Sequence, residues 1–377
     1  MAELFNQNLI YEPVAARHFN PKKIVLAKGW DRSDTQISRA KAICSVYPDA
    51  DVMDMSDVPH NRVDLNQTDL LSAHYQGKQT LVLGVHKSAL RFSEEDNNTC
   101  PNFWHFSPYG FCPYGCKYCY LAGTPGVKFS PTVKVFLNLE QILSQIVKTA
   151  SQFKEPTAFY LGKLQDSLAL DSLTCYSMIM IPFFGRQKYA RMTMLSKCGD
   201  IENLLDLEHN GHTILSWSLN PPEVSEMFET NVPSISERIS AMQKCAEAGY
   251  PVRAVVMPII PIDNWQQVYC EFFKSLLTDI ELDRITLGQI CSYSTAMKLT
   301  ERKLGRQNVI SNKLEKVKSL DGRIRFPDQL RVNVYKHIIG YIEKQRPDFQ
   351  IGLCLEEKPI FKSLGMETAI GRCNCVL

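Results

Sequence analysis

Short apolar runs alternate with amphipathic stretches along most of the chain. Beyond residue 105, six runs have the length and composition of buried strands, at residues 158–161, 191–195, 213–219, 252–256, 285–290 and 349–354. Helical patterns separate them, notably at residues 137–149, which Asn138 opens, and at 234–248 and 265–277. Strands spaced by helices typically form a parallel sheet with crossover connections. The pattern therefore predicts an α/β fold whose sheet is closed or partly closed into a barrel.

A smaller unit of the same kind precedes this region. Strand-like residues 23–27 and 79–84 flank a helical stretch at 38–46, and turn-forming residues fill the passage from 94 to 111. We expect three parts: an N-terminal α/β cap over residues 1–105, the barrel over 106–355, and a C-terminal tail over 356–377.

Composition narrows the class of protein. The chain has 377 residues, of which 45% are hydrophobic and 22% charged, which excludes a disordered protein. The 42 basic and 40 acidic residues nearly balance, so net charge gives no reason to bind nucleic acid, although Lys298, Arg302, Lys303 and Arg306 form a local basic group. Residues 1–11 lack the apolar core of an export signal, and no apolar stretch is long enough to span a membrane. We expect a cytoplasmic protein.

Thirteen cysteines stand out in such a chain. Without an export signal, reduced thiols and metal ligation explain them better than a disulfide framework. Six of them lie singly in apolar or mixed surroundings, where a cysteine is usually a small buried hydrophobe. These are Cys44, Cys175, Cys198, Cys245, Cys270 and Cys291.

Cys112, Cys116 and Cys119 form a Cys-x3-Cys-x2-Cys motif. A loop with this spacing can wrap three thiolates around one face of an iron–sulfur cube and leave one iron open for a ligand. A zinc site is the alternative, and it would need a fourth ligand such as Cys100 or His105.

The motif and several further stretches resemble the radical S-adenosylmethionine superfamily, and more closely the spore photoproduct lyase family. The matching stretches occur in one order over about two thirds of the chain: LVLGV at 81–85, CKYCYL at 116–121, VFLNL at 135–139, HNGHT at 209–213 with SLN at 218–220, and AGY at 248–250 with VVMPI at 255–259.

This resemblance implies a partial (β/α)6-type radical S-adenosylmethionine barrel. It implies that the three motif cysteines hold a [4Fe-4S] cluster, that S-adenosylmethionine chelates the open iron, and that a low-potential donor of the flavodoxin or ferredoxin type supplies an electron. By the same resemblance, Tyr118 is expected beside the adenine. The other expected cofactor contacts are Gln165, Lys197, Ser218 and Asn220.

Two departures from the family lie near the expected active site. The family carries a cysteine that returns a hydrogen atom to the product radical, and Lys163 stands at the aligned position in this chain. The family's lesion-binding hairpin corresponds to the shorter stretch at residues 319–326. Both departures argue against DNA repair, because flipping a lesion needs a wedge and a cationic groove. Lys163 and Tyr120 are nevertheless expected among the catalytic residues.

The C-terminal tail adds further thiols. Cys373 and Cys375 form a Cys-x-Cys pair, and Cys354 ends the last predicted strand. The three could converge as catalytic residues near the cluster and bind zinc, a second cluster or a metalloid such as arsenite. Alternatively, the tail only plugs the barrel.

These observations favour a lyase or transferase that cleaves S-adenosylmethionine and acts on a non-DNA substrate, either a small molecule or a metalloid. One version resembles the arsinothricin-pathway radical enzymes, which transfer a 3-amino-3-carboxypropyl group to arsenic. The alternative is repair of ultraviolet-damaged DNA, as in the spore photoproduct lyases, with another hydrogen donor.

Overall fold

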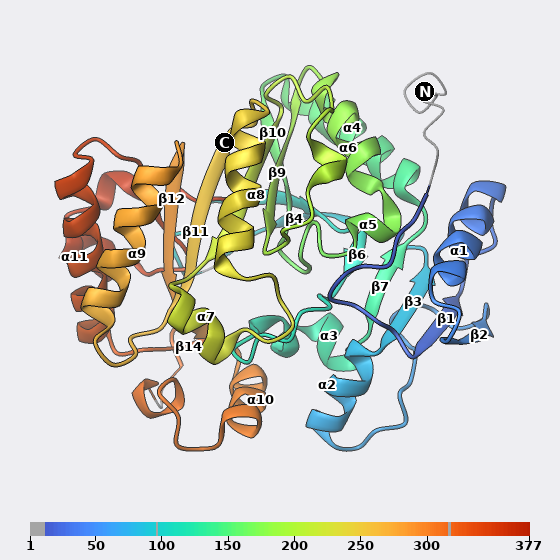
Figure 1. The fold of residues 1–377 in the computed structure, drawn as a ribbon, viewed down its shortest axis with the longest axis horizontal. Helices are drawn as coiled ribbons and strands as arrows, with labels where there is room; N and C mark the ends of the chain where they lie inside the picture. The colour runs from blue at the N-terminus through green and yellow to red at the C-terminus, as the bar shows by residue number, and fades with distance from the viewer. Residues whose placement is uncertain (1–11, 96, 316–317) are drawn as a thin grey trace.

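The computed structural model describes residues 12–95, 97–315 and 318–377, and two sheets organise the fold (Figure 1). The larger sheet has eight strands in the order β15-β12-β11-β10-β9-β8-β5-β4. All neighbouring strands are parallel except β4 and β5, and the described strands leave β15 and β4 as two open edges. The strands are β4 (Leu90–Ser93), β5 (Phe103–Phe106), β8 (Thr157–Leu161), β9 (Ala190–Ser196), β10 (Thr213–Leu219), β11 (Val252–Ile259), β12 (Arg284–Gln289) and β15 (Ile351–Leu353).

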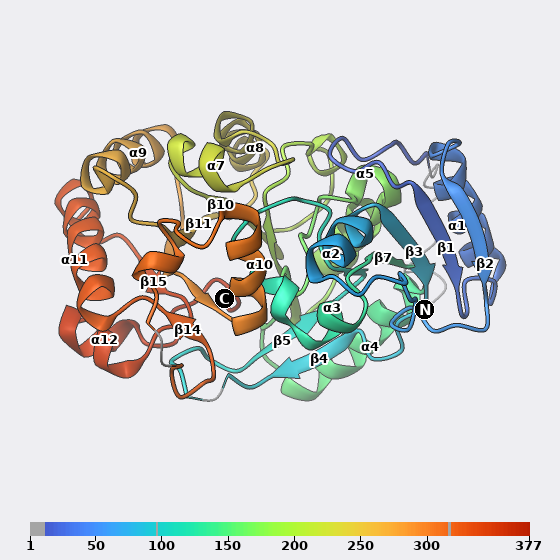
Figure 2. The same ribbon diagram turned by 90° about the horizontal axis from the view of Figure 1, so that it is seen from below.

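Helices cover the outside of this sheet (Figure 2). In α4, Leu139, Ile142, Leu143 and Ile146 recur at helical spacing and are all buried, which explains the predicted amphipathic pattern. The helices of this part are α4 (Leu139–Phe153), α5 (Asp171–Thr174), α6 (Tyr176–Gly185), α7 (Pro222–Phe228), α8 (Ile235–Glu247), α9 (Trp265–Asp279), α10 (Ser294–Leu304), α11 (Asp328–Gln345) and α12 (Lys358–Leu364). Short 3-10 helices are η2 (Tyr120–Gly123), η3 (Glu202–Leu204), η4 (Ser311–Lys313) and η5 (Glu367–Ala369).

The smaller sheet has five strands in the order β2-β1-β3-β7-β6, of which β6 alone is antiparallel to its neighbour. Its strands are β1 (Lys23–Ala27), β2 (Asp51–Met55), β3 (Thr80–Gly84), β6 (Tyr109–Gly110) and β7 (Val133–Phe136), accompanied by α1 (Asp34–Val46), α2 (Leu70–Lys78) and α3 (Pro125–Phe129). Buried side chains of both sheets, such as Ile24 and Leu215, belong to one continuous core. The domain boundary at residue 105 stays a prediction. β4 precedes this boundary but joins the larger sheet, and β7 follows it but joins the smaller one.

A two-stranded sheet pairs β13 (Cys291–Ser292) with β14 (Ile324–Arg325), with Ser292 opposite Ile324. It attaches the short hairpin at residues 319–326 to the end of the larger sheet, just beyond β12.

The predicted α/β fold is confirmed, with a parallel sheet that stays partly open. The six predicted strand runs correspond to β8, β9, β10, β11, β12 and β15, and the three predicted helices to α4, α8 and α9. Within the described residues, no helix is long and apolar enough to cross a membrane. Residues 1–11, on which the argument against an export signal depended, lie outside the described residues.

Candidate functional site

The loop that carries the Cys-x3-Cys-x2-Cys motif runs from β6 to η2. Hydrogen bonds to the end of α7 and the residues after it hold this loop in place. The Gly115 N–H donates to the Thr230 carbonyl at 2.8 Å, and the Thr230 hydroxyl donates back to the Gly115 carbonyl at 2.8 Å. The Lys117 N–H donates to the Phe228 carbonyl at 2.8 Å. A Cβ at Gly115 would lie 2.6 Å from the Thr230 hydroxyl oxygen, so only glycine allows this close approach.

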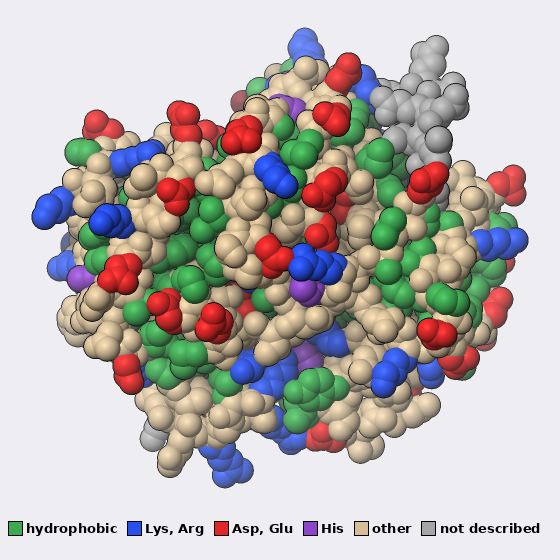
Figure 3. Space-filling view, in the orientation of Figure 1, with side chains coloured by type: hydrophobic (Ala, Val, Ile, Leu, Met, Phe, Trp, Pro, Cys, Tyr) green, Lys and Arg blue, Asp and Glu red, His purple; other side chains and the backbone are tan. Residues whose placement is uncertain are grey.

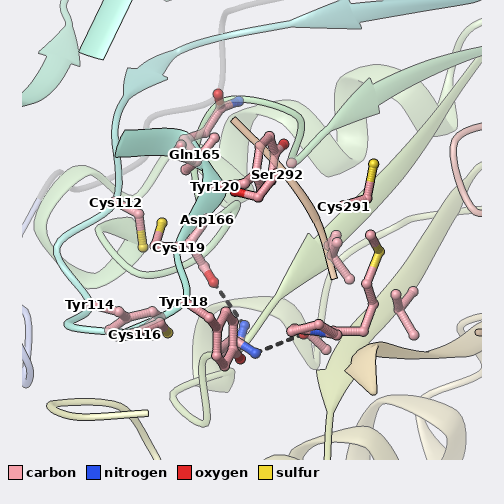
Figure 4. A pocket seen from close by; sticks show the side chains of 18 of the residues that line it. Cys112, Tyr114, Cys116, Tyr118, Cys119, Tyr120, Gln165, Asp166, Cys291 and Ser292 are labelled. Carbon is pink, nitrogen blue, oxygen red and sulfur yellow. Dashed lines mark hydrogen bonds between the residues drawn. The ribbon is translucent and has the colours of Figure 1, made fainter. Parts of the chain in front are cut away.

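The three motif cysteines line one cavity (Figure 4), which holds about 930 Å³ of empty space, part of it open solvent. Tyr118 and Tyr120 form part of the same wall, together with three of the predicted cofactor contacts, Gln165, Lys197 and Ser218. The described wall does not include the fourth predicted contact, Asn220. That side chain is buried and accepts a hydrogen bond from the Tyr269 hydroxyl at 3.2 Å instead.

The chemistry of the three thiols fits an iron–sulfur cluster better than a zinc ion. Among the described residues, no three His, Cys, Asp or Glu side chains are grouped to hold a single metal ion. A zinc site needs such a group, whereas an iron–sulfur cube takes each thiolate on a different iron. The proposed fourth zinc ligands lie elsewhere, since Cys100 interacts with Cys354 and Cys373, and His105 lies near Lys163. Burial raises the pKa of Cys116 to about 12, so a cluster would have to displace its proton.

Lys197 is fixed by a buried carboxylate that sequence reasoning missed. Its ammonium donates to the Ser218 hydroxyl at 2.7 Å and to Glu229 at 2.9 Å. The same carboxylate accepts from Arg238 at 2.6 Å and from the Tyr118 hydroxyl. Burial alone would raise the pKa of Glu229, but the charges of Lys197 and Arg238 outweigh it and hold that pKa at about 2. Glu229 therefore stays ionised.

A second carboxylate that was missed, Asp166, joins two strand ends at the cavity. It accepts from the Ser196 hydroxyl at 2.6 Å and from the Lys197 N–H at 2.8 Å, and its own loop donates through Leu168 and Ala169. Figure 4 shows Asp166 between Tyr118 and two of the motif cysteines, Cys112 and Cys119. It ties the loop after β8 to the end of β9. The sequence did hold a signal for it: Asp166 lies three residues after Lys163, in the segment from which Lys163 and Gln165 were already chosen as site residues.

Lys163 lies beside the cavity but engages an acidic partner. Its ammonium pairs with Glu95 at 2.7 Å and also contacts the Ser93 hydroxyl. Arg323 of the hairpin pairs with the same Glu95 at 2.8 Å. The Tyr120 hydroxyl donates to the Lys163 carbonyl at 2.5 Å, so Tyr120 connects the cavity wall to this ion-pair network.

The C-terminal tail lies against strands of the larger sheet, where Figure 2 marks the C-terminus, and four cysteines meet there. The sulfur atoms of Cys373 and Cys375 are 3.7 Å apart, and Cys373 also interacts with Cys354 and Cys100. The tail is held by strands β10, β11 and β12: Ser216 donates to Asn374 at 2.8 Å, Arg253 to the Val376 carbonyl at 2.6 Å and Arg284 to the Cys373 carbonyl at 2.8 Å. The predicted convergence of the tail thiols thus includes Cys100, a residue from a distant segment. The described cavity wall includes none of the four.

A family model described as "Spore photoproduct lyase" matches residues 19–318. The chain is 34% identical over 213 residues to "Spore photoproduct lyase" from Geobacillus sp. (strain Y412MC61), which covers 56% of this chain and 60% of that protein. It is 32% identical over 220 residues to the protein of the same name from Bacillus subtilis (strain 168), covering 58% and 62%. The match therefore spans about three fifths of the length of these relatives.

Solved structures show the same fold. "Spore photoproduct lyase complexed with dinucleoside spore photoproduct" has a TM-score of 0.77 at 24% identity and covers 89% of this chain and 99% of that chain. A double mutant of that lyase "with bound AdoMet and dinucleoside spore photoproduct" has a TM-score of 0.76 at 24% identity, covering 88% and 98%.

These findings overturn the predicted non-DNA substrate. The relatives are named for a photoproduct, and a solved structure of this fold holds a dinucleoside photoproduct. Neither a small-molecule or metalloid partner nor carboxypropyl transfer to arsenite finds support. The prediction gave too much weight to Lys163 and to the short hairpin, two local changes in a fold that is otherwise retained. The chain belongs to the spore photoproduct lyase family.

Proposed function

We propose that this protein is a radical S-adenosylmethionine lyase that repairs a photoproduct in ultraviolet-damaged DNA. One observation carries the proposal: Cys112, Cys116 and Cys119 line a single cavity with Lys197 and Ser218, in a fold that matches nearly whole lyase chains solved with AdoMet and a dinucleoside photoproduct. The enzyme class, the cofactors and the DNA substrate are all parts of this proposal.

Cys112, Cys116 and Cys119 would hold the [4Fe-4S] cluster. When bound, the cluster would supply the electron that cleaves a carbon–sulfur bond of S-adenosylmethionine and starts radical chemistry. The protein's own part is to orient and shield the reactants. Glu229 accepts hydrogen bonds from both Lys197 and Tyr118. It would therefore hold each of these side chains in a single conformation beside the cofactor.

The hairpin at residues 319–326 keeps features that suit a DNA lesion in spite of its shortness. Leu320 at its tip is 85% exposed, and Lys318 beside it is exposed as well. Apolar side chains can enter a base step as wedges, and cations bind phosphates. On the face drawn in Figure 3, Lys and Arg side chains gather at the lower middle, where α10 lies in Figure 1. α10 carries Lys298, Arg302 and Lys303 of the basic group predicted from sequence.

A lyase of this kind needs a hydrogen donor other than residue 163, because an ammonium has no weak bond to hydrogen. The thiols of Cys354 and Cys375 are our candidates, since their charges act on Tyr120, which lines the cavity. In the step we propose, a thiol S–H bond breaks, a C–H bond forms on the product radical, and the unpaired electron remains on sulfur. One electron and one proton from an external reductant then restore the thiol.

The test uses anaerobically reconstituted, reduced protein with S-adenosylmethionine and the dinucleoside photoproduct. We expect 5′-deoxyadenosine together with repaired dinucleotide. Cys119→Ala should lose cluster iron and both products, while Cys44→Ala, which changes a half-buried thiol in α1, should keep them. Formation of 5′-deoxyadenosine while the photoproduct stays intact would refute the proposal.

A further inference from the structure

The motif loop lies between two cavities. Its even-numbered residues from 112 to 118 line the cavity described above, and its odd-numbered residues from 113 to 117 line a second one. The second cavity holds about 1120 Å³ of empty space, part of it open solvent. At this loop, one thickness of polypeptide therefore separates the second cavity from the proposed cluster ligands Cys112 and Cys116.

The second cavity is positively charged. Among the described residues its wall includes Arg17, Lys78, Lys117 and Lys303, but no Asp or Glu. The Arg17 side chain is 57% exposed, and the hydrogen bond from the Lys117 ammonium to the Met227 carbonyl, 2.8 Å long, is exposed as well. These two charges therefore reach the solvent at the cavity.

The lysines at this cavity bind neutral acceptors. Besides the bond from Lys117, Lys78 donates to the Tyr114 carbonyl at 2.7 Å, and Lys303 donates to a ring nitrogen of His74 at 2.9 Å. An ammonium group can only donate, so the His74 nitrogen must be the acceptor. A neutral acceptor does not cancel a positive charge, and the cavity should therefore attract an anionic group.

Exposed apolar side chains beside these charges favour a protein as the partner. Tyr75, which lines the cavity, is 55% exposed, and Met227, whose carbonyl binds Lys117, is 46% exposed. Tyr, Met and Arg are enriched in protein interfaces, whereas a nucleic-acid backbone is bound mainly by cations. Lys298 and Arg302 of α10 are exposed outside the described wall of this cavity, so they stay available for DNA in the proposed function.

We propose that this second cavity and its rim bind an acidic protein that carries single electrons. Carboxylates of the carrier would pair with Arg17 and Lys117, and its apolar surface would pack against Tyr75. One electron leaves the reduced flavin or iron–sulfur centre of the carrier and enters the oxidised cluster across the motif loop, and no bond of this chain forms or breaks. The inference rests on the proposed function, because only a chain that holds the cluster needs such a carrier.

The experiment compares two ways of reducing the cluster in anaerobically reconstituted protein. Reduced flavodoxin, an acidic flavin protein, needs a docking surface. Photoreduced 5-deazariboflavin is small and uncharged, so it needs none. Bleaching of the visible absorbance of the cluster gives both rates. The variants are Arg17→Gln, Lys117→Gln and the double variant, and the matched control is Lys274→Gln at an exposed position of α9.

We expect each single variant to lower the second-order rate constant with flavodoxin about 3- to 10-fold, and the double variant about 10- to 100-fold, at low ionic strength. Added salt should shrink these differences, because it screens exposed charges. The rates with 5-deazariboflavin, the iron content and all values for Lys274→Gln should stay unchanged. Arg17 lies outside the motif loop, so the test stands even if Lys117→Gln disturbs that loop.

Equal flavodoxin rates in the unaltered protein and the double variant, with the cluster complete in both, would overturn the docking site while leaving the proposed lyase intact. The docking site is also refuted if the 5-deazariboflavin rate falls by the same factor, or if the double variant loses only its affinity for duplex DNA. If the unaltered protein takes up no iron–sulfur cluster, the proposed function itself fails, and the docking site with it.

Discussion

Lys197 and Glu229 form a buried ion pair behind the cavity, with 2.9 Å between Nζ and Oε1. The Glu229 side chain is fully buried, and it also binds Arg238 and the Tyr118 hydroxyl. One carboxylate thus holds two predicted cofactor contacts, Lys197 directly after β9 and Tyr118 on the motif loop. Glu229 is a positioning residue, because it acts on the cavity through Lys197 and Tyr118.

Replacing this carboxylate should destabilise the protein. Glu229→Gln leaves the ammonium of Lys197 and the guanidinium of Arg238 buried without a countercharge, so we expect the free energy of unfolding to fall by about 3–5 kcal/mol. Urea denaturation measures it. The control is Glu237→Gln, whose partner Arg17 is exposed, with an expected loss of about 1 kcal/mol or less. Equal losses in both variants would contradict the argument.

The pKa of Glu229 also predicts how this stabilisation depends on pH. The pKa is about 2 in the folded protein and 4.5 for an ordinary glutamate, so the folded state binds its proton less readily. The stabilisation is therefore complete above pH 4.5 and is lost as the pH falls toward 2. The stability difference between the unaltered protein and Glu229→Gln, measured by urea midpoints, should be constant from pH 7 to 5 and shrink below 4.5. A difference that grows on acidification would show that the sign is wrong.

Gly115→Ala should disturb the motif loop without touching a cysteine. The new Cβ would lie 2.8 Å from the Thr230 carbonyl oxygen, which is backbone and cannot turn aside. We expect a loss of about 1–3 kcal/mol, typical of overpacking, and lower iron content after reconstitution. Gly126→Ala is the control, since a Cβ there meets nothing within 4 Å. Normal iron content in Gly115→Ala would mean that the loop can shift.

The sequence allowed the fold and part of the site to be predicted, for different reasons. Strand and helix patterns repeat over many residues, and the spacing of Cys112, Cys116 and Cys119 places them on one loop. Glu229 could not be found, because it reaches Lys197 only through the packing of α7 against the motif loop. Cys100 is 254 residues from Cys354 along the chain, and no periodicity connects such positions.

Lys163 should be dispensable for repair, whereas the thiols of Cys354 and Cys375 should be needed as the hydrogen source. In Lys163→Ala, Glu95 keeps its partner Arg323 at 2.8 Å, so we expect a stability loss of about 1 kcal/mol or less and continued repair. The double variant Cys354→Ser with Cys375→Ser should slow repair about tenfold or more, because a hydroxyl O–H bond is too strong to donate a hydrogen atom to a carbon radical.

Deuterium provides the readout that a structural defect would not imitate. Thiol hydrogens exchange with solvent, so repair in heavy water should place deuterium in the product of the unaltered protein and of Lys163→Ala. The double serine variant should form 5′-deoxyadenosine with little deuterated product, and Cys270→Ser, at a half-buried thiol of α9, should behave as the unaltered protein. If the double variant still incorporates deuterium at the original rate, Cys354 and Cys375 are not the donors.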